Sequence, residues 1–429
     1  MTAPGKQKKK LSLMAKILIG FALGIVAGLV FSEQILWVKP IGDLFIRGLR
    51  MMVVPLIFSS LVVGVASLND INKMGRIGGR TILLVLITTA CSTCIGMFLA
   101  ITMQPGAGME APAAMPGAVK VASTSFATTL VNMVPINPIE SMAQGSVLQV
   151  IVFAVILGIA IVIAGDRAKP LYNMLEGLAE AMYKVVDIVF IIAPYGVFAL
   201  IACVVGTHGS AVLFPMLKLI VCVYLGCIIT LIFINGLFTV GLLGKCNVWT
   251  FFKHFAPAML FSFVTASSAA TLPVSMRCAQ QGMGVSKRVS SFVQPLGATI
   301  NMNGTSLYQG ICAIFVAQMM GLDLTLMELG IIVFTAVLAA VGTAGVPGAG
   351  LVMLTMVLTS IGLPVESVAI VAGVDRLLDA ARCVPNVTGD AAMALAIARG
   401  EGELDKDVFD GKKEWVDEEL HQADKLNMA

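Results

Sequence analysis

The chain has 429 residues, of which 58% are hydrophobic and 12% are charged, and its formal net charge is +3. Soluble domains carry about 25% charged residues, so this composition, with a mean hydropathy of +0.94, excludes an ordinary soluble protein. So small a net charge does not indicate nucleic-acid binding, and we expect no nucleic-acid partner. The apolar sequence is enough for about eight to ten membrane segments.

The basic N-terminus runs directly into an apolar stretch. Lys6 and Lys8–Lys10 precede the apolar run 11–31. This run is long enough to span a bilayer, and no small-residue cleavage site follows it. We therefore interpret it as a membrane helix rather than a cleaved signal peptide. The positive-inside rule places this end of the chain in the cytoplasm.

Further apolar runs predict more membrane helices before residue 245, with short charged or turn-rich joints between them. The stretch 104–117 is rich in Pro, Gly and Ala, which is typical of an exposed loop. The apolar runs are 41–68, 79–103, 123–135, 147–164, 182–206 and 211–243.

Two later segments, 252–288 and 326–363, are apolar at both ends but not in the middle. The first contains SSAATLP at 267–273, and the second contains GTAGVPGAG at 342–350. Gly and Pro open the backbone, and open backbone at membrane depth must be satisfied by protein or water. We therefore predict two re-entrant helical hairpins whose tips are buried in protein.

The same short pattern, N-x-x-G-x, follows each predicted hairpin. It reads NMNGT at 301–305 and NVTGD at 386–390. This repeated order predicts an internal repeat of a hairpin and a broken helix. Interrupted segments in corresponding halves of a membrane protein indicate the binding site of a transporter.

The last apolar helix, 367–399, carries one polar stripe. At about 100° per residue, its members fall within an arc of about 80°. Each ionisable group near the bilayer centre costs about 2.5–3.5 kcal/mol, so the four charged members would together cost about 10 kcal/mol unless paired or hydrated. The members of the stripe are Asp375, Asp379, Arg382, Asn386 and Asp390.

Three carboxylates against one guanidinium leave the stripe with a net charge of −2. One Asp–Arg pair could be a structural ion pair, but the remaining charge requires cations or protons, so we favour a ligand and ion site. Asp379 suits a substrate ammonium, and Arg382 can bind a carboxylate through two hydrogen bonds. Asp390, with carbonyls around Asn301 and Asn386, offers oxygen ligands suited to Na⁺. Backbone N–H groups at the hairpin tips suit a second carboxylate.

The sequence does not indicate an enzyme. The three histidines are scattered and most of the nine cysteines lie in apolar runs, so we find no nucleophile–base pair or metal cluster and expect no organic cofactor. The tail 401–429 has ten acidic and four basic residues. We expect it to be a solvated cytoplasmic helix or mobile tail.

Four motifs, in this order, resemble the glutamate transporter family, the dicarboxylate/amino acid:cation symporters, and indicate a prokaryotic member. They are SSAATLP at 267–273, PLGATINMNGT at 295–305, GTAGVPGAG at 342–350 and the stripe from Asp375 to Asp390. The resemblance implies an all-α polytopic membrane protein with eight transmembrane helices, two re-entrant helical hairpins and inverted repeats. It also implies a homotrimer in the plasma (cell inner) membrane with both termini cytoplasmic. Transport would follow an elevator mechanism, in which a transport domain slides against a trimerisation scaffold.

This resemblance divides the chain into six parts. They are 1–78, the first two transmembrane helices (scaffold); 79–103, the third helix (transport domain); 104–206, an extended loop and scaffold helices; 207–245, the sixth helix (transport domain); 246–400, the transport core with hairpin 1, helix 7, hairpin 2 and helix 8; and 401–429, the acidic tail.

The resemblance also implies roles for individual residues, with Asp375 orienting Arg382. The residues implied to bind an acidic amino acid are Ser267, Ser268, Thr305, Val346, Gly350, Asp379, Arg382 and Asn386. One Na⁺ would be held by Gly297, Asn301, Asn386 and Asp390, and another by the second hairpin with Thr299.

The chain departs from the family pattern at one sodium site. The usual N-M-D-G-T reads NMNGT, so Asn303 replaces a carboxylate, and Val85 stands where some relatives have Tyr. Thr88 and Thr89 remain. We expect this sodium site to be missing or weak, because losing one carboxylate and one cation together leaves the charge of the loaded site unchanged. Pro385 is a second departure, and we expect it to deepen the break in the helix.

Several functions remain open at this stage. We favour sodium-coupled import of glutamate or aspartate, since Arg382 suits an acidic side chain and Asp379 suits an α-amine. Alternatives are proton- or sodium-coupled transport of C4-dicarboxylates or of small neutral amino acids. An ion channel is an alternative of another class, but paired hairpins around a compact mixed-charge site fit occlusion of a solute better.

Overall fold

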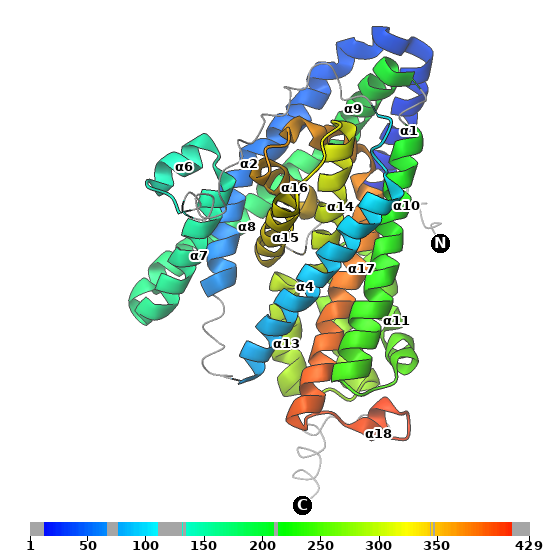
Figure 1. Ribbon diagram of the computed structural model, residues 1–429. Helices are drawn as coiled ribbons and strands as arrows, with labels where there is room; N and C mark the ends of the chain where they lie inside the picture. The colour runs from blue at the N-terminus through cyan, green and yellow to red at the C-terminus, as the bar shows by residue number, and fades with distance from the viewer. Residues whose placement is uncertain are drawn as a thin grey trace, which may run out of the picture.

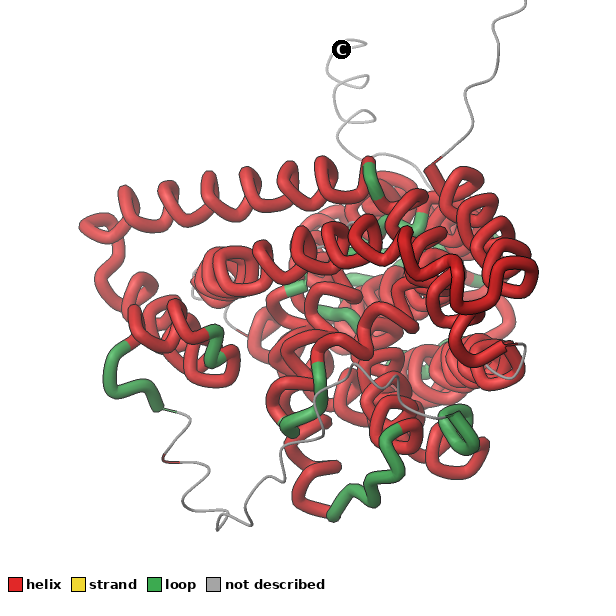
Figure 2. Tube along the Cα trace, turned by 90° about the horizontal axis from the view of Figure 1, so that it is seen from above, coloured by secondary structure: helices red, strands yellow, loops and turns green. Residues whose placement is uncertain are grey.

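The computed structural model describes residues 13–66, 76–109, 131, 134–209, 213–343, 345 and 348–413, and it confirms the predicted all-helical class. Over these residues the chain consists of helices joined by turns (Figure 2), with one isolated bridge between Val285 and Leu404 and no strand. The helices, in chain order, are α1 (Leu13–Phe31), α2 (Lys39–Ala66), α4 (Arg76–Met103), α6 (Pro138–Gln144), α7 (Val147–Ala164), α8 (Lys169–Ile191), α9 (Ala193–His208), α10 (Leu213–Ile229), α11 (Val248–Thr265), α12 (Ser268–Arg277), α13 (Lys287–Ile300), α14 (Asn303–Met319), α15 (Leu326–Gly342), α16 (Ala349–Ser360), α17 (Val368–Glu401) and α18 (Lys406–Phe409). Two helices end in π-helical turns: α10 continues through Thr230–Leu243 and α12 through Cys278–Gly282.

Helices α1 and α9 pack closely along their length (Figure 1). Glycines four residues apart on α1 face α9: a Cβ at Gly24 would lie 2.8 Å from the carbonyl oxygen of Phe198, and a Cβ at Gly28 would lie 2.8 Å from that of Ala202. Small residues at this spacing let two helix backbones approach each other, as in helix pairs within membranes. Helix α2 packs against α7 and α8. The ring of Phe58 on α2 stacks on that of Phe153 on α7, with centroids 5.9 Å apart.

Helices α14 and α17 form the centre of the molecule (Figure 1). Of the residues of α14, 303–317 and 319 are buried, and α4 and α10 pack against this helix. Helix α17 is buried from 368 to 398 except at positions 369, 376 and 377. Polar side chains of α14 and α17 are therefore held inside the protein rather than against solvent.

Two antiparallel helix pairs stand at the positions predicted for the hairpins. Helices α11 and α12 turn at residues 266–267, and helices α15 and α16 turn between 343 and 348. The first pair is followed by an interrupted helix, because α13 ends at Ile300 and α14 begins at Asn303. The predicted break at 301–302 is thus confirmed.

The break predicted near Asn386 is wrong, because α17 runs through Pro385 without interruption. Proline lacks the N–H that would bond to the carbonyl four residues earlier, which costs about 3 kcal/mol in a helix interior. Here the amide Nδ2 of Asn235 donates a hydrogen bond of 3.0 Å to the carbonyl of Pro385. This bond does not replace the one lost at the carbonyl of Ala381, but packing of a buried helix against its neighbours can support a proline within it.

The beginning of the acidic tail is docked rather than solvated throughout. Phe409 is 1% exposed, and its carbonyl lies 3.1 Å from Nε2 of His254 on α11. The N–H of Ser286 donates to the carbonyl of Glu403 at 3.0 Å. Residues 414–429 lie outside the described part of the chain.

By length and composition, three helical stretches of the described chain could cross a membrane. They are Ile19–Phe45, Ile77–Met103 and Leu213–Leu243, and shorter apolar helices cover Ala193–Thr207, Leu326–Val341 and Ala349–Ser360. Large apolar side chains are also exposed, for example Ile163 (80%) and Leu326 (88%). Exposed apolar surface of this kind marks a membrane or protein interaction surface.

Candidate functional site

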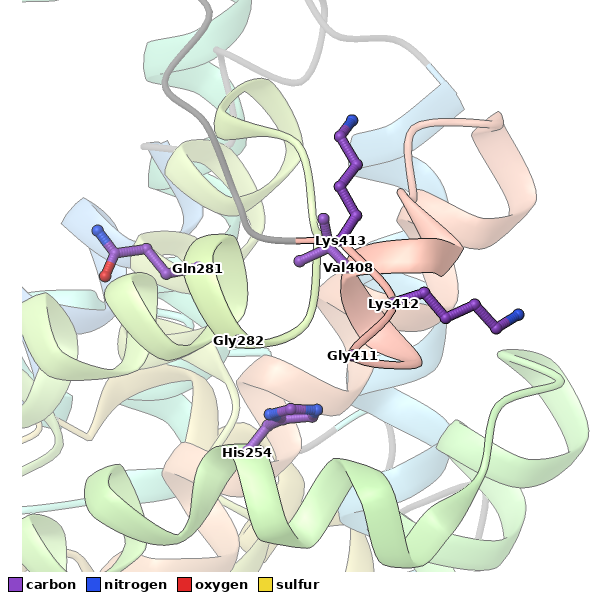
Figure 3. Close-up of a pocket in the computed structure, with 7 residues that line it drawn as sticks. All are labelled: His254, Gln281, Gly282, Val408, Gly411, Lys412 and Lys413. Atoms are coloured by element: carbon purple, nitrogen blue, oxygen red, sulfur yellow. The ribbon is translucent and has the colours of Figure 1, made fainter.

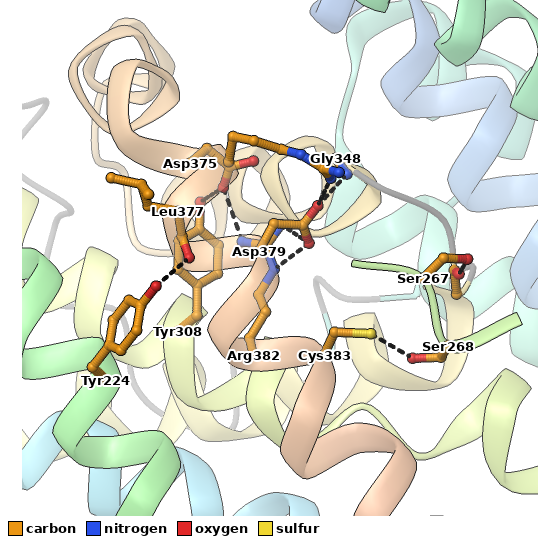
Figure 4. Close-up of polar contacts among 12 residues, drawn as sticks. Tyr224, Ser267, Ser268, Tyr308, Gly348, Asp375, Leu377, Asp379, Arg382 and Cys383 are labelled. Atoms are coloured by element: carbon orange, nitrogen blue, oxygen red, sulfur yellow. Dashed lines mark hydrogen bonds and ion pairs between the residues drawn. The ribbon is translucent and has the colours of Figure 1, made fainter. Parts of the chain in front are cut away.

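A buried cluster of charges lies on one side of α17 (Figure 4). The guanidinium of Arg382 is 1% exposed and binds two carboxylates: Nη1 donates to Oδ1 of Asp375 at 2.9 Å, and Nε donates to Oδ1 of Asp379 at 3.0 Å. The spacing of these residues along one helix, i, i+4 and i+7, brings them to the same face. The structure therefore brings together three of the four charged residues of the predicted stripe.

Tyr308 on α14 completes the support of this cluster, and the sequence analysis missed it. Its hydroxyl donates to Oδ1 of Asp375 at 2.9 Å, and the Cζ atom of Arg382 lies 4.2 Å from the centre of its ring. The ring face attracts the cation, while the hydroxyl fixes the carboxylate. The sequence contained one indication of this role: Tyr308 follows the predicted Thr305 by one helical turn on the same buried helix.

Arg376 is a second residue that the sequence analysis did not assign to the cluster. Its Nη1 lies 3.3 Å from Oδ2 of Asp379, and its side chain is 14% exposed. The group of Asp375, Asp379, Arg376 and Arg382 is therefore neutral. With Asp390, the net charge of the buried polar groups on α17 becomes −1 instead of the −2 expected from the stripe.

The turns of both helix pairs meet beside this cluster (Figure 4). The backbone N–H of Gly348 donates to Oδ2 of Asp379 at 3.0 Å. The carbonyl of Gly345 accepts two hydrogen bonds, from Oγ of Ser267 at 2.8 Å and from the N–H of Ala269 at 3.1 Å. The hydroxyl of Ser268 contacts Sγ of Cys383 at 3.5 Å. Val346, another predicted contact, lies outside the described residues.

A small cavity of about 10 Å³ remains between the two turns and α17. A volume of this size holds about one water molecule, so the charged cluster and the turns fill most of the space between them. Six of the eleven lining residues belong to the predicted substrate set, and the other five were not predicted. The lining residues are Ala266, Ser268, Met302, Thr305, Thr343, Gly345, Gly350, Asp379, Arg382, Cys383 and Asn386.

The interruption between α13 and α14 is held against α17 by amide side chains. Oδ1 of Asn386 accepts the N–H of Gly304 at 2.8 Å, and its Nδ2 donates to Oγ1 of Thr305 at 3.2 Å. Nδ2 of Asn301 donates to Oδ1 of Asp390 at 2.8 Å. The predicted residues Asn301, Asn386 and Asp390 thus lie together at one helix break.

Two other predicted ion ligands differ in their surroundings. Gly297 lies directly against the carboxylate of Asp390, so that a Cβ at this position would collide with it. Thr299 is exposed, and its hydroxyl donates to the carbonyl of Leu296 at 2.6 Å. Gly297 is therefore near the other predicted ligands, whereas the side chain of Thr299 faces away from the protein interior.

The third group of predicted ion ligands is buried around Asn303. Oγ1 of Thr89 donates to Oδ1 of Asn303 at 2.9 Å, whereas Oγ1 of Thr88 bonds back to the carbonyl of Leu84 at 2.8 Å. Among the described residues, Nδ2 of Asn303 and Oδ1 of Asn235 have no hydrogen-bond partner. An amide donor at this position repels a cation instead of attracting it.

A larger cavity of about 590 Å³ lies beside His254 of α11 and shares no lining residue with the small cavity (Figure 3). The side chains of Lys412 and Lys413 point away from His254, and Lys413 pairs with Asp405 at 3.1 Å. Its basic groups are therefore exposed and paired with carboxylates, and it offers no buried charge to a ligand. The lining residues are His254, Gln281, Gly282, Val408, Gly411, Lys412 and Lys413.

Comparison with known proteins agrees with the resemblance seen in the motifs. Residues 13–400 match the sodium:dicarboxylate symporter family. The chain is 35% identical over 410 residues to the proton/sodium-glutamate symport protein of Geobacillus stearothermophilus, covering 93% of this chain and 97% of the relative. It is 35% identical over 416 residues to the proton/glutamate-aspartate symporter of Escherichia coli (strain K12), covering 92% and 94%. It is 32% identical over 415 residues to the C4-dicarboxylate transport protein of Azorhizobium caulinodans, covering 95% and 92%.

An all-helical apolar chain that matches transport proteins over nearly its whole length is a membrane transport protein. The chain belongs to the sodium:dicarboxylate symporter family, and it is a symporter of dicarboxylates or acidic amino acids rather than an enzyme.

Proposed function

We propose that the protein imports glutamate or aspartate together with Na⁺. The observation that carries this proposal is the pair of opposite charges, Arg382 and Asp379, buried side by side where the two helix turns meet. A zwitterionic substrate with an acidic side chain has one ammonium for Asp379 and one carboxylate for Arg382. Two relatives are named as glutamate symporters, which agrees with this pairing.

The other carboxylate of the substrate would bind at the two turns. Ser267, Ser268, Gly348 and Gly350 lie at the N-termini of α12 and α16, whose backbone N–H groups favour anions; Val346 would contribute as a further contact. Thr305 and Asn386 would contact the substrate from the opposite side, since both line the cavity. Asp375 would orient Arg382, with Tyr308 fixing Asp375 in turn.

Sodium would travel as a second cargo in one site or more. Asp390 with the backbone carbonyls of Gly297, Asn301 and Asn386 supplies hard oxygen ligands, and the hydrogen bond from Asn301 to Asp390 supports their proximity. A second Na⁺ would use the second hairpin and the backbone at Thr299. We propose that the site at Thr88, Thr89 and Asn303 no longer binds Na⁺, because the amide of Asn303 now bonds with Thr89.

We further propose an elevator mechanism in a homotrimer. The transport domain would comprise 79–103, 207–245 and 246–400, and the scaffold would comprise 1–78 and 104–206. In this arrangement α11–α12 and α15–α16 are re-entrant hairpins among eight transmembrane helices, and both termini are cytoplasmic in the cell inner membrane. The support is the close packing of α1 with α9 and of α2 with α7 and α8, which forms one group of helices beside the central helices α14 and α17.

C4-dicarboxylate transport is a second candidate, which two observations favour. Asp379 is already bound by two guanidinium groups, which leaves less room for a substrate ammonium. One relative is named as a C4-dicarboxylate transport protein.

Uptake by purified protein in liposomes tests these proposals. Sodium and pH gradients are imposed separately, and accumulation of aspartate, glutamate, succinate and alanine is measured. Asp379→Ala, with Asp379→Asn as the isosteric control, should abolish uptake of the amino acids and spare succinate. Aspartate uptake that needs no sodium gradient would contradict sodium coupling, and unchanged aspartate uptake by both variants would contradict the role of Asp379.

A further inference from the structure

Arg376 contacts the same carboxylate that the proposed function assigns to the substrate ammonium. Its Nη1 lies 3.3 Å from Oδ2 of Asp379, in the first turn before it on α17. Its Nε–H has no hydrogen-bond partner among the described residues. Arg376 is therefore fixed at this place mainly by Asp379.

Asp379 has little capacity left for another donor. Oδ1 is contacted by both Nε and Nη2 of Arg382, at 3.0 and 2.9 Å, and Oδ2 accepts from the N–H of Gly348 as well as from Nη1 of Arg376. A carboxylate offers about four acceptor positions. An incoming ammonium must therefore displace a donor. Arg382 is also held by Asp375, and the donor of Gly348 is a backbone N–H that cannot rotate away as a side chain can. Arg376 is therefore the donor that has to leave.

The surroundings make the displacement of Arg376 costly. A gap of about 10 Å³ separates Arg376 from α1, α2 and α9, and its lining is apolar except for Asp375, Arg376 and Asp379. Asp375 already accepts from Arg382 and from Tyr308. Breaking a largely buried ion pair is expensive because one charge then lacks its partner. The apolar lining residues are Ile17, Phe45, Ala193, Val197, Leu351 and Ala372.

We propose that Arg376 is a specificity-determining residue that competes with the substrate ammonium for Asp379. It lowers affinity for acidic amino acids relative to dicarboxylates that lack an amine, because only an amine requires Asp379 to release Arg376. This inference rests on the proposed function in one respect, that Asp379 receives the ammonium.

The test compares aspartate and succinate in the same proteoliposomes. Arg376→Gln removes the charge and frees one acceptor position on Oδ2 of Asp379, which keeps its bond from Gly348. The KM for aspartate should fall, and the ratio of the KM for succinate to that for aspartate should rise about tenfold or more. Arg376→Lys keeps a cation and should retain the wild-type ratio. Arg376→Met, which keeps an aliphatic side chain, provides the same measurement if the glutamine variant does not fold.

Arg399→Gln is the matched control, since Arg399 is an exposed arginine on the same helix. It lies 23 residues further along α17, about 35 Å away at 1.5 Å per residue, and should leave the ratio unchanged. The inference is overturned if the ratio of the KM for succinate to that for aspartate stays constant, or falls, in Arg376→Gln and Arg376→Met. If Asp379→Asn leaves aspartate uptake intact, the proposed function fails. If Asp379→Asn abolishes it while the Arg376 variants keep the wild-type ratio, only the role of Arg376 fails.

Discussion

Gly350 lies so close to the guanidinium of Arg382 that even one methyl group should disturb the site. A Cβ added at Gly350 would stand 2.9 Å from Cζ of Arg382, 3.0 Å from its Nη2 and 3.0 Å from Cγ2 of Thr305. Ordinary contact begins at 3.4 Å, so Arg382 would have to move by about half an ångström, yet it is 1% exposed and held by two carboxylates. We expect Gly350→Ala to raise the KM for aspartate about tenfold, since misplacing a binding group by 1 Å can cost about 100-fold.

A second glycine variant separates the effect on protein stability from the effect on substrate binding. Gly330→Ala changes a glycine in another helix, where a Cβ would meet nothing within 4 Å. Gly330→Ala gains up to about 1 kcal/mol of helix propensity, whereas Gly350 lies in the first turn of α16, and Gly350→Ala adds an overpacking cost of about 1–3 kcal/mol. Gly350→Ala should therefore melt below Gly330→Ala in the same detergent and lipid. Equal melting temperatures together with a wild-type KM for aspartate would refute the close contact between Gly350 and Arg382.

Three further outcomes are expected. Asn303→Asp restores a carboxylate beside Thr89, so uptake should depend more steeply on sodium concentration; an unchanged Hill coefficient would contradict the lost site. Ser267→Ala removes the cap of α12 and the bond to Gly345, and should cost about 1–2 kcal/mol in thermal unfolding, whereas Ser286→Ala, another N-cap, should cost a similar amount without changing substrate affinity. The ammonium of Lys413 and two backbone N–H groups lower the pKa of Asp405. Because this folded-state pKa lies below the unfolded value of about 3.9, the contribution of Asp405 is present above that pH and is lost as pH falls through the folded pKa. Protection of the amides of residues 402–413, measured relative to their intrinsic exchange rates, should therefore fall below about pH 4, and a loss of protection already at pH 6 would contradict this origin.

The sequence predicted those parts of the site whose residues lie on a single helix or in a single turn. Asp375, Asp379 and Arg382 share a face of α17 because their spacing follows the helical period, and they do contact one another. The turns near Ser268 and Gly348 could also be located, since Gly, Pro and Ser interrupt otherwise apolar segments. Periodicity within one element was sufficient for these residues.

The residues that were missed depend on packing between elements or on side-chain length. Tyr308 contacts Asp375 only because α14 and α17 are neighbours. Arg376 lies about 100° from Asp375 around the helix, off the polar stripe, but its long side chain reaches back to Asp379. The continuity of α17 through Pro385 likewise reflects the burial of this helix among its neighbours. No pattern within the last helix contains that information.

The carbonyl oxygen of Gly345 has two lone pairs, and both are occupied across the contact between the two helix turns, by Ser267 and Ala269. A partial separation that keeps one of these bonds would still hold the turns within hydrogen-bonding distance. Both bonds must therefore break before the two turns can part.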